Sequence, residues 1–177
     1  GRYFANQFKE DSLLRAVEAY REAVRLDPNY ALPHVGIADF YVLSTIFGVF
    51  PPREGYPQAK EELRLALEAD DNLAEAYSLS AFIALLYDWD WEKADRFVEK
   101  ALQLNPHYHL AHDVKAHILA SQGIVEPAAG EIEFSERLDP LSLRTKTLVA
   151  WTIYQTLRYE EALAVARQIV EVYGNYP

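Results

Sequence analysis

Four of the five histidines lie within eleven consecutive residues, and they are the first candidates for chemistry in the sequence. They are His107, His109, His112 and His117. In a helix, His109, Asp113 and His117 have the spacing i, i+4, i+8 and lie along one face, where imidazoles and a carboxylate suit a divalent metal. The ends of this row are about 12 Å apart along the helix axis, so the three side chains cannot share one ion. We therefore expect no metal site and interpret the row as the polar wall of a groove that titrates at about pH 6.5.

The rest of the sequence shows no catalytic motif. It has no phosphate-binding loop, no dinucleotide fingerprint, no nucleophile elbow and no zinc-protease helix. The absence of cysteine excludes disulfides, thiol catalysis and thiolate metal sites. The carboxylate pairs Glu61–Glu62 and Glu160–Glu161 fall on polar helix faces, where they form a solvated surface. We expect that the segment is not an enzyme and binds no cofactor.

Composition and charge narrow the class of partner. Half of the 177 residues are hydrophobic and a quarter are charged, which is enough apolar material for a continuous core. The net charge of −10 argues against nucleic acid, which needs a basic face, and favours basic or apolar partners. No apolar run is long enough to span a membrane, and no signal peptide is visible. We expect a cytoplasmic location, and because the chain has no Met and opens on Gly1, we expect a segment of a longer protein.

The elements that must position these side chains follow a repeated pattern. A small residue is followed four positions later by a bulky one and three further by another small one, and a Pro or Asp ends the unit. The four copies are Ala16/Tyr20/Ala23/Pro28, Ala59/Leu63/Ala66/Asp71, Ala94/Val98/Ala101/Pro106 and Ala128/Ile132/Ser135/Pro140. The copies end 43, 35 and 34 residues apart, and a period near 34 indicates a solenoid of supersecondary units.

Apolar periodicity predicts an all-α chain with no sheet. The expected helices cover residues 1–8, 12–26, 31–45, 56–69, 73–87, 91–104, 107–121, 125–138, 141–157 and 159–173. Gly123 is expected to be a left-handed helix cap. Residues 46–57, with three Pro and two Gly, are expected to be an inserted loop. In that loop Phe47 and Phe50 either cover the edge of the core or contact a ligand.

These residues resemble the tetratricopeptide repeat, a helix–turn–helix unit of about 34 residues, and the resemblance covers nearly the whole chain. The second helices match through the pattern above, and the first helices match through the pairs Ile37-Ala38, Ser80-Ala81, Lys115-Ala116 and Val149-Ala150. The resemblance implies a right-handed α-solenoid forming one domain, 1–177. Its expected units are 1–30 (partial), 31–73 (with the insertion 46–57), 74–108, 109–142 and 143–177. The chain is also similar to the repeat regions of large bacterial signalling proteins and transcriptional regulators.

The family resemblance implies a concave groove lined by the second, fifth and ninth residues of each first helix. These residues are Leu32, Val35, Asp39, Glu75, Ser78, Phe82, Leu110, Asp113, His117, Arg144, Thr147 and Trp151. The family's carboxylate clamp of Lys, Arg and Asn is missing, because Arg144 is the sole basic residue of the twelve. We therefore expect a non-catalytic interaction module whose partner segment carries hydrophobic and basic side chains. Phe82 and Trp151 are alternatively packed between units.

Residues 162–173, within the last expected helix, suggest a different function. This stretch is apolar nearly all round, whereas a terminal repeat normally has a polar outer face. Either further repeats cover this end in the parent protein, or the chain forms a homodimer through Val165, Ile169 and Val172. The alternative function is therefore that of a structural or self-association segment in a larger bacterial signalling protein or transcriptional regulator.

Overall fold

A computed structural model describes residues 10–173, and every regular element in this range is helical. The elements are α2 (Glu10–Leu26), α3 (Ala31–Ile46), α4 (Pro52–Ala69), α5 (Ala74–Ile83), the π-helix η1 (Ala84–Asp88), α6 (Trp91–Leu104), α7 (His109–Ser121), α8 (Val125–Leu138), α9 (Leu143–Gln155) and α10 (Tyr159–Tyr173). The all-α prediction is confirmed. The helix expected over residues 1–8 lies outside the described residues. Within the described part, no helix has the length and apolar character required to cross a bilayer.

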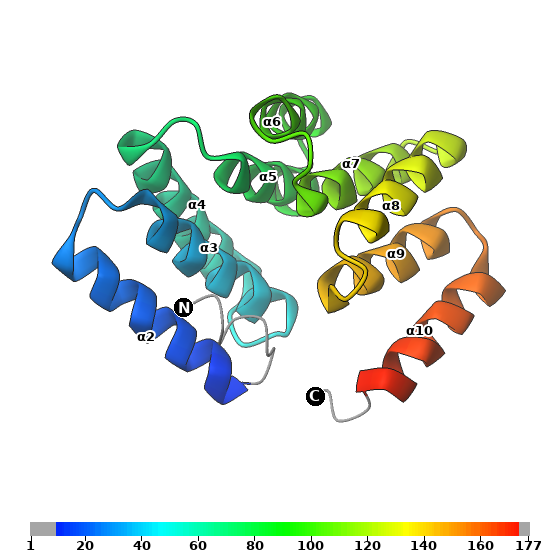
Figure 1. The fold of residues 1–177 in the computed structure, drawn as a ribbon, viewed down its shortest axis with the longest axis horizontal. Coiled ribbons are helices and arrows are strands. Elements are labelled where there is room, and N and C mark those ends of the chain that lie inside the picture. Colours follow the sequence, from blue (N-terminus) through cyan, green and yellow to red (C-terminus); the bar gives the residue numbers. More distant parts are fainter. Residues whose placement is uncertain (1–9, 174–177) are drawn as a thin grey trace.

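The helices form antiparallel pairs that follow one another around an arch (Figure 1). The closest pairs are α3 with α4, α5 with α6, α7 with α8, and α9 with α10. The first helices of the pairs, α3, α5, α7 and α9, also contact one another in order. We call this row the inner layer, and it holds the positions that the sequence assigns to a groove. Helices α2 and α10 lie at the two feet of the arch.

The repeated small–bulky–small pattern supplies the contacts inside these pairs. In α4 and α6 the small residues Ala59, Ala66, Ala94 and Ala101 have no exposed surface, so the neighbouring helices approach closely. The bulky residue between them fills the remaining space, and Val98 is likewise fully buried. In the corresponding position of α8, a serine hydroxyl replaces the methyl group and donates a hydrogen bond across to α7. The pattern therefore marks helix–helix packing, as predicted.

The expected inserted loop is shorter than predicted, because α4 begins at Pro52 rather than at residue 56. Proline suits the first turn of a helix, where its missing N–H has no partner to lose. Gly55 in that turn lies against α3 so closely that an added Cβ would be 1.8 Å from the hydroxyl oxygen of Thr45. The Phe50 ring packs against the rings of α3, whereas Phe47 is more than half exposed. Of the two aromatic side chains, Phe50 alone therefore covers the core edge.

Residues with left-handed backbone follow η1, α7 and α9, and the sequence predicted the one after α7. The helix expected to run through residue 87 ends at Ile83 and continues as η1, after which Trp89 has a left-handed φ of 55°. At the end of α7, Gly123 has the predicted left-handed conformation, with φ 77°. Leu157 has the same conformation after α9, with φ 64°, although it is not a glycine.

Candidate protein-binding surface

The twelve predicted groove residues lie on the inner layer and fall into three groups by solvent exposure. Five are buried: Val35, Ser78, Phe82, Asp113 and His117. Another five are half-buried: Leu32, Asp39, Glu75, Leu110 and Arg144. Two, Thr147 and Trp151, are exposed, and both are on α9. The buried side chains fill the spaces between helices. Only the other seven are accessible for direct contact with a partner at this surface.

An ion pair joins the first and the last helix of the inner layer. Arg144 on α9 donates a hydrogen bond to Asp39 on α3 over 2.6 Å, although 105 residues separate them in the chain. The two side chains are only 17% and 25% exposed. Burial alone would lower the pKa of Arg144, but the Asp39 carboxylate outweighs burial and raises it. Two of the residues expected to contact a ligand are thus engaged with each other.

Asp113 is a carboxylic acid in the interior between α7 and α9. Its side chain is 2% exposed, and its Oδ2 accepts a hydrogen bond from the Thr145 hydroxyl at 2.9 Å. No hydrogen-bond donor among residues 10–173 reaches its Oδ1. Burial raises the pKa of Asp113 to about 6, and the hydroxyls of Ser135 and Thr145 and the Arg144 guanidinium act in the opposite direction. Asp113 is therefore part of the packed interior rather than of the accessible surface, and its carboxyl group is held near its titration point.

Trp151 connects this interior to the surface. Its ring packs edge-on against the His117 ring with 5.5 Å between the ring centroids. His117 is 2% exposed, and burial lowers its pKa to about 4, so its imidazole is neutral at pH 7. The uncharged ring packs against the indole, and 47% of Trp151 remains accessible. Trp151 is therefore an exposed aromatic side chain of the inner layer that packs against a buried ring.

Two exposed aromatic side chains near Trp151, Tyr154 and Tyr159, were not among the groove residues predicted from the sequence. Tyr154 follows Trp151 by three positions and Thr147 by seven, so the three share one face of α9. Tyr154 is 59% exposed, and its ring lies 5.3 Å from that of Tyr159 at the start of α10. We call Trp151, Tyr154 and Tyr159 the aromatic surface. The helical spacing from Thr147 could have indicated Tyr154, whereas the family's groove positions stop one turn earlier.

The histidine row of α7 points toward different neighbours. His109 lies 3.8 Å from the Asp139 carboxylate, and His112 bonds Glu131 at 2.6 Å. For His112 burial lowers the pKa, but the Glu131 carboxylate, the Pro106 carbonyl and Asp113 together outweigh burial and raise it. His117 faces the interior, as described above. In the described part of the chain, no three His, Asp or Glu side chains converge on a point suited to a metal ion.

The residues predicted for self-association lie on α10, which packs against α9. Val165 is half-buried against the cluster formed by Ala116, Ile132 and Val149. Ile169 is also half-buried. The side chain of Val172 lies outside the described residues. The outer side of α10 instead exposes Leu163 and Val170, at 52% and 66%.

Comparison with known sequences gives relatives of low identity. No protein-family model matches the chain. The transcriptional regulator HilA of Salmonella paratyphi A is 24% identical over 172 residues, and HilA of Salmonella typhimurium is 23% identical over the same length. Each alignment covers 96% of this chain but 30% of the relative. The chain therefore spans about a third of the length of the curated relatives it matches.

Comparison with solved structures identifies the fold. TTC0263, a TPR protein of Thermus thermophilus, superposes with a TM-score of 0.69 at 16% identity and covers 96% of this chain and 88% of its own. Yeast Tom70 gives 0.56 at 15% identity, covering 93% of this chain and 33% of its own. MamA gives 0.52 at 20% identity, covering 94% and 91%. The chain has the right-handed, all-α superhelical fold of tetratricopeptide-repeat proteins.

Proposed function

We propose that the chain is a non-catalytic protein-interaction module that binds a partner segment on the inner layer, at the aromatic surface. The observation that carries this proposal is the exposure of Trp151, whose ring packs against the buried His117. Binding energy at protein interfaces is concentrated in a few residues, among which Trp and Tyr are enriched. Their large rings offer apolar area while losing little conformational entropy on binding. A supported indole beside two exposed tyrosine rings has these properties.

The charge distribution indicates what the partner carries. Arg144, the sole basic residue among the twelve groove positions, is neutralised by Asp39. The groove positions therefore offer no unpaired cation for the terminal carboxylate of a peptide. With a net charge of −10, the chain attracts basic segments over long range. We infer a partner segment that places an apolar side chain on Trp151 and has basic side chains beside it, in agreement with the sequence-based expectation.

The test compares two tryptophans in one chain. Trp151→Ala combined with Tyr154→Ala removes two of the three rings of the aromatic surface, and Trp89→Ala removes a 73% exposed tryptophan from the turn after η1. Each protein is used to capture partners from lysate of the source cell, after circular dichroism shows equal helix content. We expect a partner captured by wild type and by Trp89→Ala to be lost with the double variant. Equal capture by all three proteins contradicts the proposal.

A second candidate function is self-association, and the exposed apolar side chains of α10 favour it. Leu163 and Val170 present apolar surface outward from α10, which lies at one foot of the arch (Figure 1). The similarity to part of HilA supports a place inside a larger regulator, where such a face packs on another subunit. Leu163→Glu with Val170→Glu should convert a dimer to a monomer in light scattering. A monomeric wild type, or a dimer in both proteins, rules this function out.

A further inference from the structure

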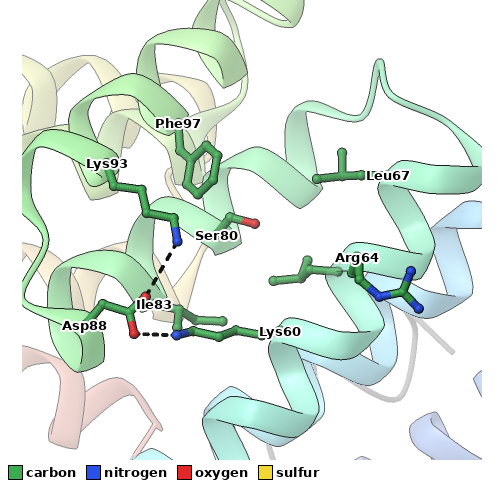
Figure 2. A pocket seen from close by; sticks show the side chains of 9 residues that line it. Lys60, Arg64, Leu67, Ser80, Ile83, Asp88, Lys93 and Phe97 are labelled. Carbon is green, nitrogen blue, oxygen red and sulfur yellow. Dashed lines mark hydrogen bonds and ion pairs between the residues drawn. The ribbon is translucent and has the colours of Figure 1, made fainter.

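A cavity of about 320 Å³ opens between α4, α5, η1 and α6 (Figure 2). Its floor is apolar and well ordered by packing, because Leu63 and Ile83 are 3% and 1% exposed. Leu67 and the Phe97 ring form its side walls. Ligand pockets in proteins start at about 300 Å³ and are mostly apolar with a few polar groups that fix orientation. This cavity therefore suits a small ligand with an apolar body.

The polar groups of the cavity carry an excess of positive charge. Lys60 from α4 pairs with Asp88, and Lys93 from α6 lies 4.0 Å from the same carboxylate (Figure 2). Two ammonium groups thus face one carboxylate, in a protein whose net charge is −10. Each ammonium group has three N–H donors, and the lysines are 40% and 42% exposed. They keep the capacity to bind a further anion.

Arg64, the third basic residue of the cavity, is already paired with carboxylates outside it. Arg64 stands at the rim, and its guanidinium is directed away from Asp88. It is held by Glu61, at 2.7 Å, and by Glu68 on the same helix. The aromatic walls support the lysines instead. The Lys60 ammonium lies 5.1 Å from the centroid of the Tyr87 ring, and that of Lys93 lies 5.7 Å from the centroid of Phe97.

The backbone places Asp88 between the two lysines by an irregular turn. The backbone hydrogen bonds of the π-helix η1 span one residue more than those of an α-helix, and Asp88 is its last residue. The chain then turns sharply at Trp89, and the Asp90 N–H donates back to the Ala84 carbonyl at 3.0 Å. Single π-helical turns occur frequently at functional sites. This one lies where the charged and the apolar parts of the cavity meet.

We propose that the cavity binds a small amphipathic monocarboxylate. The carboxylate of the ligand accepts hydrogen bonds from the ammonium groups of Lys93 and Lys60, beside Asp88. Its apolar body contacts Leu67 and the ring of Phe97, above the buried Ile83. The site is independent of the aromatic surface on α9, so the chain is able to hold the small ligand and a protein partner at the same time.

Octanoate is the probe, and titration calorimetry with the whole chain gives its affinity. Acetate, which lacks the apolar body, and octanamide, which lacks the charge, are the matched comparison compounds. We expect saturable binding of octanoate, with much weaker binding of the other two. No saturable binding of octanoate up to about 10 mM overturns the proposal, and so does equal binding of octanamide.

Three variants locate the site. Lys93→Met removes an ammonium group that Asp88 holds only at 4.0 Å, and it should weaken octanoate binding about tenfold. Lys100→Met is the matched control, because its ammonium group lies on α6 over the Tyr77 ring, outside the cavity. Asp88→Asn removes the competing carboxylate and should tighten binding severalfold. That increase cannot come from misfolding. Equal affinities for the Lys93 and Lys100 variants, or weaker binding by the Asp88 variant, refute the assignment.

Discussion

Replacing Asp113 by Asn should make the stability of the protein less dependent on pH. Asp113 is buried, and its pKa in the folded chain is about 6, against an ordinary value of 3.8. The folded state therefore binds the proton more tightly than the unfolded state does. The stability that the protonated Asp113 contributes is fully present below about pH 3.8 and is lost as the pH rises through about 6. Asparagine has nearly the same shape and stays neutral throughout this range.

The size of the effect follows from the two pKa values. Their difference corresponds to about 3 kcal/mol of stability lost by wild type at about pH 8. The variant avoids this loss and keeps an oxygen to accept the Thr145 hydroxyl. Its new amide N–H replaces Oδ1, which has no donor within residues 10–173, and an unsatisfied N–H costs about 1–2 kcal/mol. We expect Asp113→Asn to be more stable than wild type by about 1–2 kcal/mol at about pH 8, and less stable at about pH 4.

The measurement is urea unfolding followed by circular dichroism at several pH values between these limits. Buried His117 changes the stability of both proteins alike, because its lowered pKa removes stability as the pH falls from about 6.5 toward about 4. The difference between the two proteins therefore isolates Asp113. Asp95→Asn, at an exposed position on α6, controls for the loss of one negative charge. A difference that stays constant with pH, or that favours wild type at high pH, refutes this account.

Three further substitutions test the packing, and urea unfolding measures each. Gly36→Ala should lower the unfolding free energy by about 1–2 kcal/mol, because the new Cβ would be 2.4 Å from the Tyr20 ring. This clash outweighs the better helix propensity of Ala. An increase in the unfolding free energy contradicts this contact. Leu157→Gly should raise the unfolding free energy by about 1 kcal/mol, because Leu157 has a left-handed φ of 64° that strains a residue with a Cβ. An unchanged unfolding free energy means that the backbone at Leu157 is not strained. Arg144→Met should lower the unfolding free energy by about 2 kcal/mol, and additivity with Asp39→Asn in a double-mutant cycle would show that the pair does not interact.

The sequence predicted the helices well because their signals are local. The spacing of small and bulky residues marks the faces that meet inside each pair, and the predicted bounds of α6, α8 and α10 match the structure. The predicted start of α4 is wrong because proline, which commonly breaks a helix, also suits the first turn of one. The π-helix was missed because its sequence, from Ala84 to Asp88, continues the apolar pattern of α5 without interruption.

The surface residues were harder to predict because their exposure depends on the curvature of the solenoid. The family's positional rule gives the direction of a side chain from its own helix, but not how close the next helix comes. At Phe82 the neighbouring helices close over the ring, which is 5% exposed. At Trp151, no later helix in the described chain covers the same face of α9. The positions given by the rule are therefore exposed at Thr147 and Trp151 on α9 but buried at others, such as Val35 and Phe82.

The pairing of Arg144 with Asp39 shows how this curvature changes the function that the fold supports. An open solenoid presents its inner residues as a continuous groove, in which a basic residue is available to a ligand. Here the first and the last helices of the inner layer come close enough for a 2.6 Å hydrogen bond, and the one basic groove residue is used internally. A partner must then either compete with Asp39 for Arg144 or bind beside the pair. The aromatic surface lies farther along α9 from Arg144 and needs no such competition, which is why we place the partner there.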